Sequence, residues 1–163
     1  IAFIDADDLW HKDKLKKQIS FMKHKKCDFS YTGYSIMNEG GALIKNIKAT
    51  KLIDYISLIR SCDIGTSTVV LKKVLLKRDK FPKTTTKEDY ILWLKLCKKG
   101  IKMRGLNLTL ASWRKSSNSL SSSVFQKIRD AYIVYNKHLK FNLIKSIYSI
   151  MILSINAVRK RNL

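Results

Sequence analysis

Three carboxylates stand within four positions at the end of an apolar run. The chain opens with IAFI, residues 1–4, and this run stops at Asp5-Ala6-Asp7-Asp8. A short, partly β-branched apolar run that ends abruptly predicts a buried strand followed by a loop. Carboxylates this close repel one another unless a cation neutralises them. The pattern therefore predicts a site for a hard divalent ion at a strand end, or, as the alternative, Asp8 capping the next helix with the other acids in solvent.

Strand-like and helix-like segments alternate along the rest of the chain, which favours an α/β fold. A helix is expected over 10–25, where Leu15, Ile19 and Met22 are spaced as one apolar face. Further helices are predicted over 50–60, 84–100 and 124–161, a helix or turn over 74–81, and strands over 27–37, 42–47, 64–73 and 102–114.

A second group of acids, Glu88-Asp89, falls in the first turn of the helix predicted over 84–100. Thr residues at its start are suitable N-caps, and Gly100 is a suitable C-cap. Acids at a helix N-terminus interact favourably with the helix dipole, which is one interpretation of the pair. The other interpretation is a general base that a rigid helix holds in place.

Taken together, these motifs resemble family 2 glycosyltransferases. FIDADDLWHKDKLKKQISFM, residues 3–22, resembles the DXD segment of that family, and EDYILWLKL, residues 88–96, resembles its ED segment. IGTSTVVLKK between them is similar to the strand that usually precedes the ED segment, and WR…NSLSSS to the close of the catalytic domain. The resemblance covers roughly residues 1–125.

The resemblance implies a GT-A fold, a Rossmann-like α/β domain whose first half binds the nucleotide. On this basis residues 1–115 are the C-terminal part of the catalytic domain, with the N-terminal part missing, and residues 116–163 are a Ser-rich loop and an amphipathic helical tail. The chain alone is then expected to be incomplete and inactive. The expected site lies where the DXD strand meets the acceptor half.

The implied reaction is inverting transfer of a sugar from a nucleotide-sugar to a hydroxyl acceptor, in bacterial surface glycan synthesis. By the resemblance, Asp7 and Asp5 would hold Mn²⁺ or Mg²⁺ on the donor diphosphate, with Asp5 contacting either the ribose or the metal shell.

The remaining roles are also implied by the resemblance. Asp89 would take the proton of the acceptor hydroxyl, and Glu88 would support the acceptor side. Asp8 would support the donor site, cap the following helix or act as a ligand. Arg114 would bind the donor diphosphate or simply end a strand.

The charge of the chain leaves its partners open. The net charge is +21, and the basic residues are mostly Lys and are spread from Lys12 to Lys160. Such a surface is either simply solvated, or lies against anionic lipid, or binds nucleic acid. Base readout favours Arg over Lys, so no nucleic acid is expected. A non-catalytic basic module that binds a membrane surface or nucleic acid remains the alternative to an enzyme.

Two further features bear on location. The three cysteines, Cys27, Cys62 and Cys97, are far apart and form no CxxC pair, which excludes a disulfide scaffold and predicts reduced thiols in the cytoplasm. The segment 141–158 is strongly apolar, but only 13 uncharged residues lie between Lys145 and Arg159, which is too few to span a bilayer. It predicts a helix packed on its own domain or on a dimer partner, or one lying in the inner face of the membrane near a lipid-linked acceptor.

Overall fold

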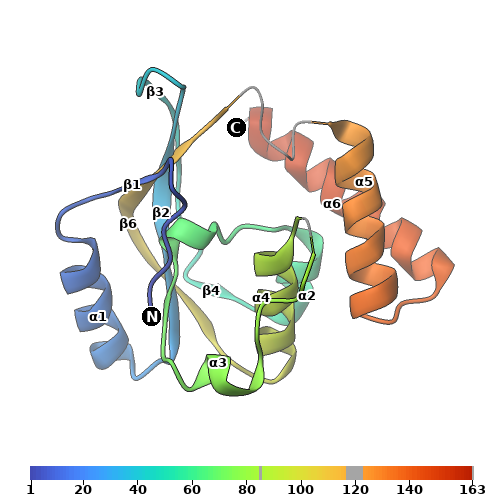
Figure 1. Cartoon of the computed structure of the whole chain (residues 1–163), viewed down its shortest axis with the longest axis horizontal. Helices are drawn as coiled ribbons and strands as arrows, with labels where there is room; N and C mark the ends of the chain where they lie inside the picture. Colours follow the sequence, from blue (N-terminus) through green and yellow to red (C-terminus); the bar gives the residue numbers. More distant parts are fainter. Residues whose placement is uncertain (85, 117–122, 163) are drawn as a thin grey trace.

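A six-stranded mixed sheet forms the centre of the computed structural model, which describes residues 1–84, 86–116 and 123–162 (Figure 1). Four strands follow one another in the order β1-β6-β2-β3, while β4 pairs with β6 and β5 with β2. The long strands β2 and β6 run parallel, and the other pairs are antiparallel. The strands are β1 Leu9–Trp10, β2 Phe29–Met37, β3 Leu43–Ile47, β4 Leu52–Ile53, β5 Val70–Leu71 and β6 Met103–Arg114.

Helices cover both faces of this sheet. Helix α1 lies on one face, α2 and α4 lie on the other, and α5 and α6 form an outer layer beyond α2 and α4 (Figure 1). The helices are α1 Lys14–Lys25, α2 Tyr55–Arg60, the 3-10 turn η1 Thr66–Thr68, α3 Leu75–Arg78, α4 Glu88–Lys98, α5 Val124–Ile133, the π-helical turn η2 Val134–His138 and α6 Leu143–Asn162.

Helix α4 is the most deeply buried helix of the core. Seven of its eleven residues are buried, so apolar contacts surround it on nearly every side. Trp93 is fully buried and packs edge-on against Phe29, with ring centroids 5.0 Å apart, and against Phe81 at 6.0 Å. Burial of this kind fixes a helix rigidly, and α4 carries the Glu88-Asp89 pair at its first turn.

The apolar face predicted for helix 10–25 is wrong. Leu15 and Ile19 are exposed, whereas Lys14 and Gln18 are fully buried beside Met22. The polar side chains are tolerated inside because they bond one another. The ammonium of Lys14 donates to the Gln18 Oε1 atom at 3.0 Å, and the Gln18 Nε2 atom donates to the carbonyl of Thr68 at 2.9 Å.

Three predicted segments are shorter than expected. Residues 1–4 form a single bridge, Ala2 to Val70, rather than a buried strand, and Ile1 and Ile4 are exposed. Only Val70–Leu71 of the predicted strand 64–73 is a strand, because Thr66–Thr68 coils into a 3-10 turn. The predicted helix 50–60 begins at Tyr55, where Asp54 caps it by accepting from the Ser57 N–H at 2.7 Å.

The predicted Thr caps of α4 are also wrong. The N-cap is Lys87, in a left-handed conformation with φ of 64°, and it makes no side-chain cap bond. Thr86 does not cap because its hydroxyl donates to Asp130 of α5. At the other end the prediction is confirmed, since Gly100 follows the helix with φ of +86° and its N–H donates to the carbonyl of Cys97 at 3.0 Å.

The C-terminal segment forms two packed helices that join the main core. The hydroxyl of Tyr135, in η2, donates to the carbonyl of Ile59 at 2.7 Å, and Tyr135 is fully buried. Five apolar side chains of α6 face outward, with exposed fractions of 45 to 80%. They are Leu143, Ile144, Ile147, Met151 and Ile155. Ser146 and Ser149 occupy the buried face.

Candidate active site

A cavity of about 330 Å³ brings the two acidic motifs together. Asp5 and Asp8 of the DXD loop line it, together with Asp89 from the first turn of α4. The residues of η1 form another wall, and Ala111 and Trp113 of β6 face it from the sheet. Residues more than eighty positions apart in the sequence therefore share one site.

Asp89 is held by a side chain from η1. The hydroxyl of Thr66 donates to the Asp89 Oδ2 atom at 2.8 Å, and the N–H of Tyr90 donates to Oδ1 at 2.7 Å. Both oxygens are oriented, and the helix that carries Asp89 is fixed by its buried face. A carboxylate held in this way is suited to receive a proton from a substrate hydroxyl.

The DXD loop is tied to the same 3-10 turn. The Ser67 Oγ atom accepts from the N–H of Asp5 at 3.0 Å, and the carbonyl of Ser67 accepts from the indole N–H of Trp10 at 2.7 Å. The turn therefore bonds to Asp89 on one side and to the loop of Asp5 on the other. It sets the relative position of the two motifs.

Asp8 and Arg114 connect this loop to the end of β6. Asp8 is only 6% exposed, and its Oδ1 atom accepts from the backbone N–H of Arg114 at 3.0 Å. The guanidinium of Arg114 donates to two backbone carbonyls, that of Asp7 at 3.0 Å and that of Glu39 at 2.7 Å. Asp8 does not cap α1, whose N-cap is Asp13. The donor-binding role of Arg114 stays a prediction.

Negative charge dominates the cavity. Partial burial raises the pKa of Asp5, and the neighbouring carboxylates Asp8, Asp89, Asp7 and Glu88 raise it further. Burial also raises the pKa of Asp8, although the Ser67 hydroxyl and the Arg114 N–H oppose the change. Carboxylates that raise one another's pKa repel when they are ionised, and a bound cation would reduce this repulsion.

Not every predicted residue lines the cavity. Asp7, Glu88 and Arg114 lie outside its lining, although the charges of Asp7 and Glu88 reach Asp5. Within the described ranges, no three acidic, His or Cys side chains converge on a common metal position. A metal site here would therefore take one or two protein carboxylates and complete its shell from substrate oxygens, which is the usual arrangement for Mg²⁺.

Several cavity residues carry no readable signal in the sequence. Thr66 and Ser67 lie in a segment whose β-branched residues predict a strand, and Lys87 lies in a predicted cap. Tyr34 also lines the cavity, where burial raises its pKa to about 12. Only the DXD, ED and WR motifs could have located part of this wall in advance.

Comparison with known proteins decides the class of the chain. A family model described as "Glycosyl transferase family group 2" matches residues 1–158. The chain belongs to this glycosyltransferase family. The resemblance seen in its DXD and ED segments is therefore confirmed, and the Asp5–Asp89 cavity lies at the motifs that carried it.

Curated relatives of this glycosyltransferase act in bacterial surface glycan synthesis. The chain is 36% identical over 162 residues to the putative teichuronic acid biosynthesis glycosyltransferase TuaG of Bacillus subtilis, covering 99% of the chain and 64% of the relative. It is 38% identical over 129 residues to the UDP-Glc:alpha-D-GlcNAc-diphosphoundecaprenol beta-1,3-glucosyltransferase WfaP of Escherichia coli, covering 78% and 50%. The chain thus spans between half and two thirds of these relatives.

A solved structure shares the fold of this glycosyltransferase. The crystal structure of S. aureus TarS residues 1–349, in complex with UDP-GlcNAc, superposes with a TM-score of 0.56 at 15% identity, covering 91% of the chain and 46% of TarS. Together with the mixed sheet and its flanking helices, this likeness confirms the GT-A-type α/β fold. No helix within the described residues has both the length and the apolar character needed to cross a bilayer.

Proposed function

We propose that the complete enzyme transfers a sugar from a nucleotide-sugar to a hydroxyl of a lipid-diphosphate-linked glycan, with inversion at the anomeric carbon. The observation that carries this proposal is the common cavity of Asp5 and Asp89, in which Thr66 fixes the Asp89 carboxylate. The name of WfaP specifies a UDP-Glc donor and an acceptor sugar linked to diphosphoundecaprenol, and TarS is in complex with UDP-GlcNAc.

In this proposal Asp89 is the general base. The acceptor hydroxyl attacks the anomeric carbon from the side opposite the leaving diphosphate, and its proton passes to a carboxylate oxygen of Asp89. The new carbon–oxygen bond forms as the bond from the anomeric carbon to the diphosphate oxygen breaks. Glu88 lies next to Asp89 on α4 and supports the acceptor side.

The DXD loop is assigned to the donor diphosphate. Asp7 and Asp5 would hold Mn²⁺ or Mg²⁺, since their carboxylates are hard oxygen ligands and the local field favours a cation. When bound, the ion offsets the charge that develops on the leaving diphosphate. Two bonds keep the loop in place at the end of β6: the Asp8 carboxylate accepts from the Arg114 N–H, and the Arg114 guanidinium donates to the carbonyl of Asp7.

The outer face of α6 is assigned to the membrane surface. Seven exposed apolar side chains fall within an arc of about 140° at 100° per residue: Leu143, Ile144, Ile147, Tyr148, Met151, Ile155 and Val158. The net charge of +21 favours anionic headgroups, and a lipid-linked acceptor places the reaction there. On this proposal the enzyme works at the inner face of the cytoplasmic membrane.

Release of nucleoside diphosphate tests this function. The full-length enzyme is incubated with a panel of nucleotide-sugars, with Mn²⁺ or with EDTA, and in parallel with its Asp7→Asn variant. We expect metal-dependent release from one donor, lost in the variant. Release that persists at the same rate in EDTA would overturn the metal assignment, and no release from any donor would overturn the function itself.

A further inference from the structure

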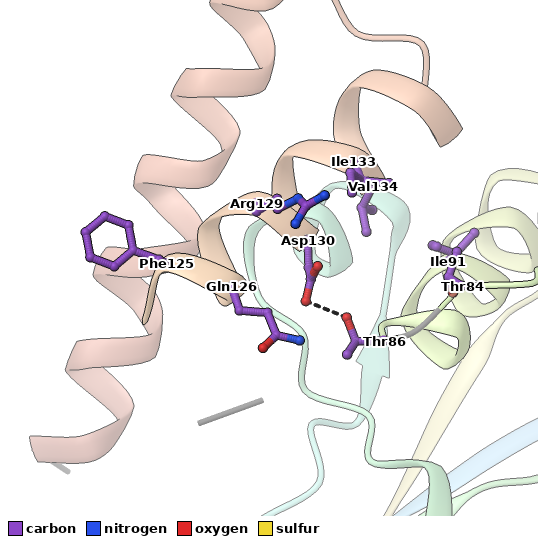
Figure 2. A pocket seen from close by; sticks show the side chains of 9 residues that line it. All are labelled: Thr84, Thr86, Ile91, Phe125, Gln126, Arg129, Asp130, Ile133 and Val134. Atoms are coloured by element: carbon purple, nitrogen blue, oxygen red, sulfur yellow. Dashed lines mark hydrogen bonds between the residues drawn. The ribbon is translucent and has the colours of Figure 1, made fainter. Parts of the chain in front are cut away.

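A second cavity, of about 550 Å³, lies between α5 and the segment that leads into α4 (Figure 2). Its polar lining includes Thr86, Gln126, Arg129 and Asp130, and Phe125 and Ile91 are among its apolar members. The mechanism proposed above uses none of these side chains. The cavity is nonetheless built against the same helix that carries Asp89.

The two cavities lie close together along the chain. Thr86 lines the second cavity and precedes Asp89 of the first by three residues. Three residues of fully extended chain span at most about 11 Å, so the Thr86 wall of the second cavity lies within about 11 Å of the backbone of the proposed base. Lys87, between them, turns the chain with a left-handed backbone.

The two charged side chains of this cavity, Asp130 and Arg129, differ in their contacts. The carboxylate of Asp130 points toward Thr86 and accepts its hydroxyl proton, which ties α5 to the start of α4 (Figure 2). Arg129 is exposed and makes no hydrogen bond or ion pair to any residue that the structure describes. A guanidinium without a protein partner is well suited to bind phosphate oxygens in a two-pronged manner.

An apolar surface adjoins this cation. Phe125 is 88% exposed and points away from the Thr86–Asp130 pair (Figure 2). It stands on the first turn of α5, beside the exposed side chains of Val124 and Ile128. A cavity whose lining includes an exposed cation and an exposed aromatic side chain fits a ligand that is anionic at one end and apolar at the other.

We infer that this second cavity binds the diphosphate of the lipid-linked acceptor, with Arg129 as its cation and Phe125 against the first carbons of the lipid. The inference rests on the proposed function, because it assumes that the acceptor sugar reaches Asp89. Asp130 then has an opposing effect: its negative charge weakens diphosphate binding while its bond to Thr86 holds the cavity in shape.

Binding of farnesyl diphosphate in EDTA tests the inference without any turnover. The titration uses the full-length enzyme, Arg129→Gln, Asp130→Asn and a control, Lys137→Gln, which removes an exposed cation from the same helical stretch outside the cavity lining. We expect Arg129→Gln to weaken binding about tenfold or more, the loss of a charge-assisted contact. Asp130→Asn should strengthen binding, and Lys137→Gln should leave it unchanged.

Equal weakening by Arg129→Gln and Lys137→Gln would overturn the inference, since binding would then follow net charge alone. No effect of Arg129→Gln would overturn it as well. A kinetic comparison separates this from failure of the proposed function: Arg129→Gln should raise the KM for a diphosphate-linked acceptor but not for a neutral glycoside of the same sugar. If Arg129→Gln releases nucleoside diphosphate with the wild-type KM for both acceptors, the proposed function stands and the assignment of the second cavity is refuted.

Discussion

Lys14 offers the sharpest quantitative test of the structure. Its side chain is fully buried, its ammonium bonds Gln18 and lies 4.4 Å from the centre of the Trp10 ring, and no carboxylate in the described part of the chain pairs with it. Burial lowers the pKa of Lys14 from 10.5 to about 8. At about 1.4 kcal/mol for each pKa unit, that difference corresponds to about 3 kcal/mol of folding free energy.

The sign of the effect follows from proton binding. Below pH 8 both the folded and unfolded states carry the proton, and the folded state bears the whole cost of a buried charge. Between pH 8 and 10.5 the folded state releases the proton while the unfolded state keeps it, so stability rises with pH. Lys14→Met removes this titration and loses the bond to Gln18, worth about 1 kcal/mol.

Urea unfolding of the wild type and of Lys14→Met, at pH values from 7 to 10.5, measures the difference. We expect the advantage of the variant over the wild type to fall by about 3 kcal/mol across this window. Lys16→Met, which removes an exposed lysine of the same helix, should show no such trend. A difference between wild type and Lys14→Met that stays constant with pH would refute the burial of a charged Lys14.

Three other variants test the site, the core and the outer surface. Thr66→Val removes the hydroxyl that donates to Asp89, so kcat should fall by about ten- to a hundredfold, with an unchanged donor KM and an unchanged circular dichroism spectrum. An unaltered kcat would exclude a positioning role for Thr66. Tyr90→Phe loses the bond to the carbonyl of Leu58 and should lower the free energy of unfolding by about 1 to 2 kcal/mol in the same urea assay, whereas an unchanged midpoint would contradict the packing. Ile144→Ser combined with Ile147→Ser should weaken sedimentation with anionic vesicles without altering the melting temperature. The control Leu43→Ser, at an exposed position on β3, should leave vesicle binding unchanged, and equal vesicle binding by the control and the double variant would argue against α6 as the membrane face.

The strongly periodic parts of the fold could be predicted from the sequence. Strand β6 and helix α4 have long, regular patterns. The bounds of β6 agree closely with the expected 102–114, and α4 lies within the expected 84–100 but begins four residues later, at Glu88. The DXD and ED acids were located by motif, because the chemistry of diphosphate binding and proton transfer requires carboxylates. The order of the motifs therefore indicated where the site would form.

The parts that failed depend on contacts distant in the sequence. Lys14 and Gln18 look like a solvated face, and only their bonds to each other and to Thr68 explain why they are buried while Leu15 and Ile19 are not. Periodicity on α6 likewise cannot say which apolar side faces the domain, because apolar residues occur all round the helix.

The contact that orients the proposed base was equally hidden. Thr66 lies 23 positions before Asp89 and in a β-branched stretch, so no local pattern indicates that its hydroxyl orients the carboxylate. The 3-10 turn that makes this contact is also bonded to the DXD loop, since the Ser67 Oγ atom accepts from the N–H of Asp5. Tertiary packing overrides the strand propensity of this segment.

Single-turnover transfer by Asp89→Asn tests the central claim most directly. The full-length variant is mixed with the donor identified in the release assay and a lipid-linked acceptor, alongside Asp28→Asn, which replaces a surface acid paired with Lys72. Asp89→Asn should bind the donor normally and transfer the sugar at least about a hundred times more slowly, the usual contribution of a general base. Transfer at the wild-type rate in Asp89→Asn would contradict the assignment of this cavity as the active site.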